Sequence, residues 1–436
     1  MLPTLSEHQM GAINGVKDWY KDDPLKRHFY LGGFAGTGKS TLLPVLIDAL
    51  DIDPSDIAFM APTGKAARVM RTKLKEADVS ADCKTIHSSI YLPSSQKADV
   101  LEKQKLALEM QIDSYGLTQG TQAPDDLLYK LQVLNAELDE AYIENEGPRF
   151  FLNIESPVFN RKLIICDEAS MVGARIADDL YKMGVPLVAI GDPGQLPPVK
   201  DDAGLTDRDP DYFLTEIHRQ AADNPIIWLS KLARDGKDIP VGNYGDAVRV
   251  VRRRDDDLTF NPEVNVQIIV GTHKKRWRVN EGVRNMMGYK SSGPCAGEPL
   301  LVCKNSRNTP SLINGLPVLC VEDVGDLTPG IATFPLRIQE EEGGTIRWVQ
   351  ACQGIFEETF LKQKDGFSCD IQAAYKAKKF AEHIDWGWCL TCHKAQGSQW
   401  DAVVLHDESS CFREDARKWL YTGITRAAEK LMIVYP

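Results

Sequence analysis

The stretch Gly33-Phe34-Ala35-Gly36-Thr37-Gly38-Lys39-Ser40 decides the fold, because it has the glycine, lysine and hydroxyl spacing of a phosphate-binding loop. It follows the apolar run from His28 to Leu31, which predicts a buried strand, and it precedes a helical run from Thr41 to Ile47. The glycines let backbone N–H groups face phosphates, and the lysine reaches the β- and γ-phosphates. A strand, this loop and a helix in that order predict a nucleoside triphosphate site.

Size and composition restrict the class of protein. The 436 residues allow two to four domains at roughly 100–200 residues each. No apolar run is long enough to cross a membrane, and the first residues lack the pattern of a secretory signal. The ten scattered cysteines favour reduced thiols in the cytoplasm, which would be the host cytoplasm for a phage protein. A net charge of −11 excludes a uniformly basic surface but not a single basic channel.

Apolar runs followed by polar turns and helical patterns predict an α/β fold with two doubly wound parallel sheets. The predicted strands are His28–Leu31, Ile57–Ala61, Leu163–Cys166, Leu187–Ile190, Val266–Val270, Val403–Leu405 and Leu431–Val434.

Two insertions interrupt this alternation. Residues from about Leu92 to Gly147 are acidic and helical in pattern, with a loop in the middle, and favour an antiparallel helical pair. Residues from about Ser291 to Asp370 contain short β-rich pieces among glycines and prolines, which predict a small β-barrel.

Residues suited to phosphoryl transfer follow the predicted strands. Asp167 fits a magnesium carboxylate, and Glu168 fits the base that orients the attacking water. Gln195, in a Pro-Gly turn after the Leu187 strand, is either a γ-phosphate sensor or an ordinary turn residue. Arg219 and Arg426 are candidates for stabilising transition-state charge, and the alternative for each is a surface ion pair.

In combination these motifs resemble superfamily 1 helicases, and within them the 5′-to-3′ branch of RecD and phage Dda. The matching segments span nearly the whole chain in the family's order. They are Gln9, the Gly33–Ser40 loop, Ala61–Ala67, Thr85–Ser88, Asp167–Ser170, Gly191–Pro197, the Arg219 segment, Thr391–Gln399 and Tyr421–Ala427. The sequence His393-Lys394-Ala395-Gln396-Gly397-Ser398 is the form typical of this branch, and Asn314-Gly315 resembles another of its elements.

The resemblance implies two RecA-like domains that hold ATP and Mg²⁺ between them, with an SH3-like barrel inserted in the second. The implied ranges are 1–90 and 151–210 for the first domain, 91–150 for the helical insertion, 211–290 and 371–436 for the second domain, and 291–370 for the barrel. It implies a monomer that binds single-stranded DNA and DNA forks in phage replication or recombination, with single-strand-binding or replisome proteins as partners.

The resemblance also assigns roles by position. The implied nucleotide ligands are Gln9, Gly33, Ala35, Gly36, Thr37, Gly38, Lys39, Ser40, Thr41 and His218, with Ser40 and Asp167 on the magnesium ion. The implied DNA contacts are Pro62, Thr63, Lys65, Thr85, His87, Thr391, His393 and Lys394. For Gln9 the alternative is a helix capping box with Ser6, and for each threonine it is a helix N-cap. His218 stands where many relatives carry a tyrosine.

Several alternatives stay open. The basic cluster Lys274–Arg278, which includes Trp277, could be a platform for a DNA strand or a solvated helix face. The insertion occupies the place of the family's strand-separating pin, yet it is longer, helical and acidic. An RNA helicase and a remodeller of protein–DNA complexes that does not unwind duplex are the competing functions.

Overall fold

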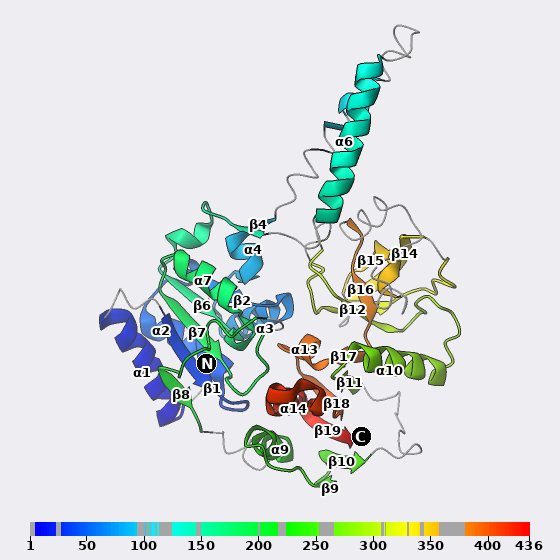
Figure 1. Ribbon diagram of the computed structural model, residues 1–436. Helices are drawn as coiled ribbons and strands as arrows, with labels where there is room; N and C mark the ends of the chain where they lie inside the picture. The colour runs from blue at the N-terminus through cyan, green and yellow to red at the C-terminus, as the bar shows by residue number, and fades with distance from the viewer. Residues whose placement is uncertain are drawn as a thin grey trace.

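The computed structural model describes residues 5–22, 28–93, 101, 104–105, 107–109, 111–112, 124–144, 150–198, 201–216, 224–252, 266–306, 309, 311–328, 331–340, 344–356 and 380–436. In this part of the chain, no helix is long and apolar enough to cross a membrane. Two sheets with helices on their faces form the body, and a helical arm projects from it (Figure 1).

The first sheet has six strands in the order β3-β2-β6-β7-β1-β8, and all of its neighbouring pairs are parallel. Its strands are β1 (His28–Gly33), β2 (Ile57–Ala61), β3 (Cys83–Thr85), β6 (Leu163–Cys166), β7 (Leu187–Gly191) and β8 (Tyr212–Leu214). Its helices are α1 (Glu7–Asp22), α2 (Leu43–Leu50), α3 (Gly64–Glu76), α4 (Ile86–Ile90) and α7 (Ala174–Lys182), with short 3-10 turns η1 (Lys39–Thr41), η2 (Pro54–Asp56), η4 (Pro157–Asn160) and η5 (Ala169–Met171).

Alternation along each strand explains why both faces of this sheet are apolar. Successive strand side chains point to opposite faces. In β6, Leu163 and Ile165 join one core cluster, which includes residues of α1, α2 and α3, whereas Ile164 and Cys166 join a second cluster that includes residues of α4 and α7. A strand that is buried on both faces must be apolar at every position, and the sequence of β6 is a continuous apolar run.

The second sheet has the order β17-β11-β18-β19-β10-β9, parallel except for the edge pair β10 and β9. Its strands are β9 (Gly242–Tyr244), β10 (Val248–Arg252), β11 (Val266–Val270), β17 (Cys389–Thr391), β18 (Trp400–His406) and β19 (Ala427–Tyr435). Its helices are α9 (Pro225–Arg234), α10 (His273–Met286), α13 (Cys392–Ala395) and α14 (Ala416–Ile424), with the 3-10 segment η7 (Ser409–Asp415). All seven strands predicted from the sequence are present in these two sheets.

A third, antiparallel sheet has five strands in the order β15-β14-β13-β12-β16. They are β12 (Pro299–Val302), β13 (Pro317–Cys320), β14 (Thr333–Glu340), β15 (Ile346–Cys352), followed by η6 (Gln353–Ile355), and β16 (Ile384–Trp386). Its two ends are joined, because Glu382 donates its N–H to Gln350 O at 2.7 Å and accepts from Cys352 N–H at 3.0 Å.

Two strands lie outside the ranges expected for their domains. β8 extends the first sheet to Leu214, past residue 210, because it pairs with β1. β16 belongs to the small sheet although it lies beyond residue 370, because it pairs with β12. Both strands are three residues long, too short to show a hydrophobic period in the sequence.

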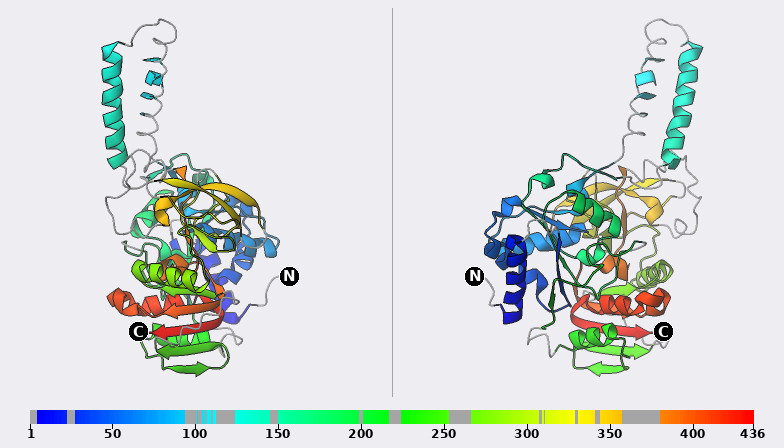
Figure 2. Two further views of the ribbon diagram at one scale, coloured as in Figure 1. Left: turned by 90° about the vertical axis from the view of Figure 1, so that its right-hand side faces the viewer. Right: turned by 60° about the vertical axis from the view of Figure 1, so that its left-hand side comes forward.

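The insertion in the first domain forms the projecting arm, whose long helix is α6 (Asp125–Glu144) (Figures 1 and 2). The described residues among 101–112 are also helical, and Gln104 and Leu108 line a hollow together with Tyr129 and Val133 of α6. The prediction of a helical pair agrees with this arrangement. At the ends of the predicted insertion, β4 (Tyr91–Pro93) and β5 (Phe150–Leu152) form an antiparallel ribbon that is the base of the arm.

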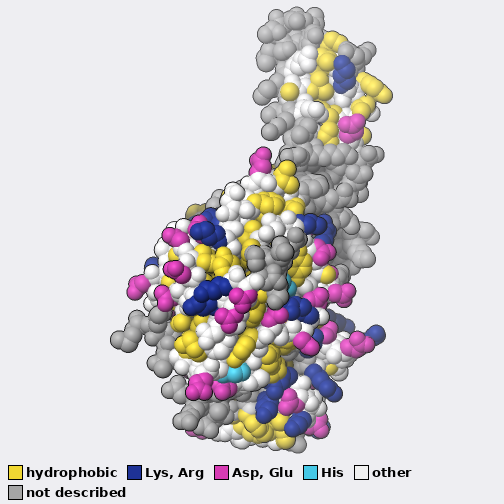
Figure 3. Space-filling model, turned by 90° about the vertical axis from the view of Figure 1, so that its left-hand side faces the viewer, with side chains coloured by type: hydrophobic (Ala, Val, Ile, Leu, Met, Phe, Trp, Pro, Cys, Tyr) yellow, Lys and Arg dark blue, Asp and Glu magenta, His cyan; other side chains and the backbone are white. Residues whose placement is uncertain are grey.

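Basic and acidic side chains alternate over the face of the molecule in Figure 3, and hydrophobic side chains lie along the described part of the arm. The net charge of −11 is therefore not gathered into one acidic surface on this face.

Candidate active site

The phosphate-binding loop lies between the carboxyl end of β1 and the turn η1, at the edge where ligands bind to open parallel sheets. Gly36 and Gly38 have φ angles of 80° and 77°, a left-handed conformation that glycine adopts without strain. The Thr37 hydroxyl donates to Phe34 O at 2.8 Å, and the Thr41 hydroxyl donates to Gly38 O. The backbone of Ser40 lies in η1.

Lys39 folds back across its own loop. Its Nζ donates to Gly33 O at 2.6 Å and to Phe34 O at 2.9 Å, and lies 3.8 Å from Asp192 Oδ2. The ammonium group thus lies among the loop, the end of β7 and the acids of β6, where phosphate oxygens would bring negative charge.

Asp167 and Glu168 follow the end of β6, as predicted. Glu168 has a left-handed backbone, with φ of 54°, which is rare outside glycine and typical of functional sites. Burial raises the pKa of both carboxyls; Lys39 lowers both, and Arg426 lowers that of Glu168. A carboxylate with a raised pKa is a better proton acceptor, which suits the role of a base.

Gln195 is 7% exposed, and its Oε1 atom has no hydrogen-bond partner among the described residues. A buried amide oxygen without a partner costs free energy unless a ligand or water satisfies it. This atom, together with Lys39, Asp167 and Glu168, forms a set that fits a triphosphate with Mg²⁺, which binds one or two carboxylates plus phosphate oxygens and water. Gln195 as a γ-phosphate sensor stays a prediction.

Asp192 and Tyr421 were missed as site residues. Tyr421, on α14, accepts the N–H of Ala35 at 2.8 Å and donates its hydroxyl to Asp192 Oδ2 at 2.7 Å. Burial raises the pKa of Tyr421 well above its ordinary value, so the hydroxyl keeps the proton that it donates. Both residues lie inside motifs identified from the sequence. Nothing in the sequence showed that they contact each other, because they belong to different domains.

Of the two candidate arginines, Arg426 is among the described residues and Arg219 is not. Arg426 is 5% exposed and donates to Thr422 O at 3.0 Å, Ser398 O at 3.1 Å and Thr425 Oγ1 at 3.1 Å. A surface ion pair is therefore the wrong alternative for Arg426. Arg219 and His218 lie outside the described residues.

Gln9 makes the contacts of the capping box. Its Oε1 accepts Ser6 N–H at 3.1 Å, and its own N–H donates to Ser6 Oγ at 3.2 Å. Its Nε2 donates to Thr37 O at 3.2 Å, which also ties α1 to the phosphate-binding loop. The adenine-reading role stays a prediction, and it would require this amide to exchange partners.

The predicted DNA-contact threonines all cap helices at the ends of strands. Thr63, Thr85 and Thr391 accept the N–H groups of Ala66, Ser88 and Lys394, at 3.2, 3.2 and 3.4 Å. The N-cap alternative is therefore correct for each, and it does not exclude a phosphate contact, because the remaining N–H groups of the first turn still point outward.

Two of the first domain's predicted strand contacts, Lys65 and Thr63, lie against Trp400 and Gly397 of the second domain. Lys65 Nζ lies 4.7 Å from the centroid of the Trp400 ring, and a Cβ on Gly397 would lie 3.4 Å from Thr63 Oγ1. Pro62 lies in the same turn after β2. Burial lowers the pKa of both His87 and His393, so each imidazole is neutral at pH 7.

Lys394 and the basic cluster are linked through one buried acid. Asp385, on β16, lies 2.8 Å from Arg276 Nη1 and 3.9 Å from Lys394 Nζ. Arg276 is 3% exposed and Trp277 is partly buried against the small sheet, whereas Lys274 and Arg278 are exposed. The cluster is therefore neither a wholly solvated face nor a wholly exposed platform.

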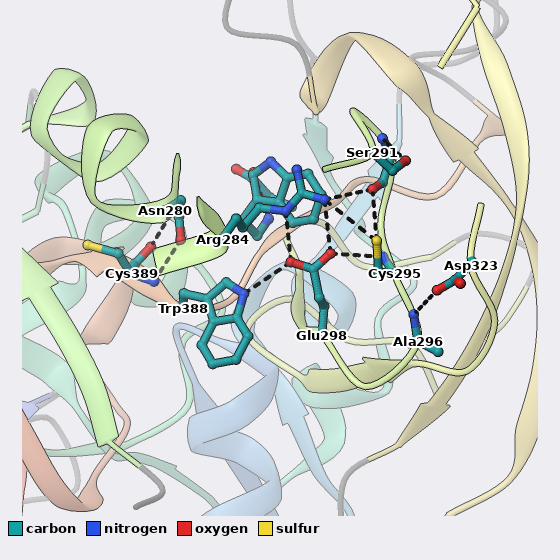
Figure 4. Close-up of polar contacts among 12 residues, drawn as sticks. Asn280, Arg284, Ser291, Cys295, Ala296, Glu298, Asp323, Trp388 and Cys389 are labelled. Carbon is teal, nitrogen blue, oxygen red and sulfur yellow. Dashed lines mark hydrogen bonds and ion pairs between the residues drawn. The ribbon is translucent and has the colours of Figure 1, made fainter. Parts of the chain in front are cut away.

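A second buried acid fixes α10 to the small sheet (Figure 4). Glu298 is fully buried and pairs with Arg284 through two contacts, Nε–Oε1 at 2.8 Å and Nη2–Oε2 at 3.1 Å. Trp388 Nε1 and Cys295 N–H also donate to Glu298, at 3.3 and 2.8 Å. Both carboxylate oxygens of Glu298 accept hydrogen bonds, so this network holds the small sheet firmly against α10 of the second domain.

These contacts define a P-loop nucleotide-binding protein in which two RecA-like parallel-sheet domains share one site. Residues 25–255 match the family model of the AAA domain, and residues 387–434 match that of the UvrD-like helicase C-terminal domain. The chain belongs to the AAA-domain family, whose model matches more than half of it, and it is similar to superfamily 1 helicases of the RecD and Dda type.

Two curated proteins and one solved structure are similar to the chain. The chain is 26% identical to the ATP-dependent RecD2 DNA helicase of Deinococcus radiodurans over 98% of this chain and 48% of the relative. It is 28% identical to the ATP-dependent DNA helicase dda of Enterobacteria phage T4, over 53% of this chain and 43% of the relative. The chain thus spans about half the length of the curated relatives it matches. A crystal structure of Pif1 helicase from Candida albicans aligns with a TM-score of 0.49 at 18% identity, covering 99% of this chain and 94% of that chain.

Proposed function

We propose that this protein is an ATP-dependent DNA helicase that moves 5′ to 3′ on single-stranded DNA and unwinds duplex. The observation that carries the proposal is the shared site, in which Tyr421 of the second domain bonds to Ala35 and Asp192 of the first, and Arg426 of the second domain lowers the pKa of Glu168. Hydrolysis at such a site depends on how the two domains close, and alternating closure can move a bound strand. The named activities of the RecD2 and Dda relatives support this function.

Each residue has a distinct part in the proposed reaction. Lys39 and the loop N–H groups would hold the phosphates, Ser40 and Asp167 would hold Mg²⁺, and Glu168 would take the proton of the attacking water. Bound Mg²⁺ neutralises charge on the phosphate oxygens. Gln195, Arg219 and Arg426 would stabilise the transferred group, and Gln9 and His218 would contact the base.

The proposed path of the strand follows the contact between the domains. Pro62, Thr63, Lys65, Thr85 and His87 line the first domain's part, and Thr391, His393 and Lys394 line the second domain's part. Contacts by hydroxyls, helix N-termini and neutral imidazoles grip the backbone without reading sequence. This suits a motor that must pass every sequence, and forked DNA is the natural substrate.

We also propose the domain division. The first RecA-like domain comprises residues 1–90 and 151–210 together with β8, and the arm comprises residues 91–150. The small sheet, residues 291–370 together with β16, is an SH3-like barrel, which its joined edges support. Residues 211–290 and 371–436 otherwise form the second domain, and the motor works as a monomer.

The decisive experiment compares unwinding of duplexes that carry a 5′ or a 3′ single-stranded tail. We expect ATP-dependent unwinding of the 5′-tailed duplex only, and loss of ATPase and unwinding in Lys39→Ala. Unwinding confined to the 3′ tail would refute the polarity, and activity that survives Lys39→Ala would refute the motor itself.

The same assays separate the competing functions. Stronger ATPase stimulation by an RNA strand than by the matching DNA strand would make the protein an RNA helicase. ATPase stimulation by single strands without unwinding of either tailed duplex would make it a remodeller of protein–DNA complexes.

A further inference from the structure

We propose that Tyr421 and Arg234 of the second domain are positioning residues that hold the phosphate-binding loop in its working shape. The inference rests on the proposed ATPase function and deepens it, since it names the residues through which domain closure reaches the loop. Both act on Phe34 and Ala35, the first two residues after β1.

The Tyr421 hydroxyl joins three segments that are far apart in the sequence. It accepts the N–H of Ala35, 386 residues away, and donates to Asp192 at the end of β7, 229 residues away. Tyr421 is 1% exposed and Asp192 is fully buried, so water does not compete for these bonds. Asp192 in turn lies 3.8 Å from Lys39 Nζ, which connects the phenol to the phosphate-binding lysine.

Arg234 makes the second contact with the loop. Its guanidinium carbon lies 3.7 Å from the centroid of the Phe34 ring, a close cation–π geometry. The Phe34 ring also packs edge-on against Phe213 of β8, with 4.7 Å between centroids. Phe34 is therefore fixed between the edge strand of its own domain and helix α9 of the other domain.

The turn after β7 is also fixed to α14, the helix that carries Tyr421. Leu196 N–H donates to Thr422 Oγ1 at 2.9 Å, and a Cβ on Gly194 would lie 3.0 Å from Tyr421 Cε1. The neighbouring Thr422 also accepts Arg426 Nε through its carbonyl. One turn of α14 thus contacts the loop, the β7 turn and the candidate transition-state arginine, so a movement of α14 reaches all three together.

The test is Tyr421→Phe, with Tyr435→Phe as the matched control. Tyr435→Phe also removes one phenol hydrogen bond, the bond to Ile239 O at 3.1 Å. That bond lies within the second domain and away from the phosphate-binding loop. In Tyr421→Phe we expect the strand-stimulated kcat to fall by about tenfold, because two buried hydrogen bonds are lost, with KM for ATP changed by less than about twofold. Arg234→Gln should lower kcat in the same direction.

A second measurement needs no hydrolysis. In the wild type, a non-hydrolysable ATP analogue should change the Kd for a fluorescent thymine-rich strand, and in Tyr421→Phe that change should shrink toward none. Equal behaviour of Tyr421→Phe and Tyr435→Phe in both assays, at matched thermal unfolding midpoints, would overturn the inference. If the wild-type protein shows no ATPase activity that Lys39→Ala abolishes, the proposed function is refuted instead. The strand-affinity assay then still decides whether Tyr421 couples the two domains.

Discussion

At the scale of single residues, the structure concentrates negative charge where the chemistry needs it. Asp167 and Glu168 are adjacent, and burial raises the pKa of both. The folded state therefore binds their protons more tightly than the unfolded chain does. The ionised carboxylates consequently lower the stability of the folded protein, although they are suited to activate water.

We predict that Glu168→Gln loses ATPase activity but raises the free energy of unfolding at pH 7 by about 1 kcal/mol. Because the folded pKa is raised, the destabilising contribution is absent below the ordinary carboxyl range and complete above the raised pKa. The advantage of Glu168→Gln in urea unfolding should therefore be largest at neutral pH and vanish as the pH falls. An advantage that grows in acid would contradict the sign of the shift.

At the scale of elements, buried ion pairs connect α10 to the small sheet. Arg276 with Asp385 forms one pair and Arg284 with Glu298 forms the other, and three of these four residues are at most 4% exposed. Sequence alone could not single out Arg276, because four of the five residues Lys274–Arg278 are basic. The helical period shows which residues share a face of α10, but the position of the small sheet decides which face is buried.

We predict that Arg276→Ala lowers the free energy of unfolding by about 3–5 kcal/mol, because the buried Asp385 then keeps the N–H of Trp386 but loses its close cation, and Lys394 lies farther away. Lys274→Ala, which removes an exposed cation from the same helix, should change it by less than about 0.5 kcal/mol. Urea unfolding measures both. Equal, small effects would mean that the Arg276 pair does not stabilise the folded state.

At the scale of the whole molecule, the arm is set apart from the rest of the protein. It leaves the first domain through the ribbon of β4 and β5, and α6 projects away from both sheets (Figure 2). Tyr129, a large aromatic side chain of α6, is 68% exposed. We therefore predict that the arm is the strand-separating element, since it occupies the place of the pin in the family that the sequence resembles.

We predict that replacing residues 94–149 by a short Gly-Ser turn keeps strand-stimulated ATPase within about twofold but abolishes duplex unwinding. The physical reason is that the nucleotide site is built from the ends of β1, β6 and β7 together with α14, whereas a fork must meet a rigid obstacle to be split. Stimulated ATPase and tailed-duplex unwinding are measured on the same preparation. Full unwinding by the shortened protein would assign the arm to a protein partner.

The sequence by itself determined the two parallel sheets, the phosphate-binding loop and the acids after β6. These features are local: the Gly33–Ser40 loop is recognised from its own glycines, lysine and hydroxyl, and a buried strand must be apolar on both faces. The short strands β8 and β16 escaped prediction, since three residues carry no period.

Only the tertiary structure decided which residues act together. Ala35 and Tyr421 are hydrogen-bonded although 386 residues separate them, and Arg276 is buried although its neighbour Lys274 is exposed. Such pairs depend on how separately folded surfaces dock, and the spacing of residues in one chain does not encode that docking. The loop that set the fold is thus complete as a motif, but its working geometry depends on residues of the other domain.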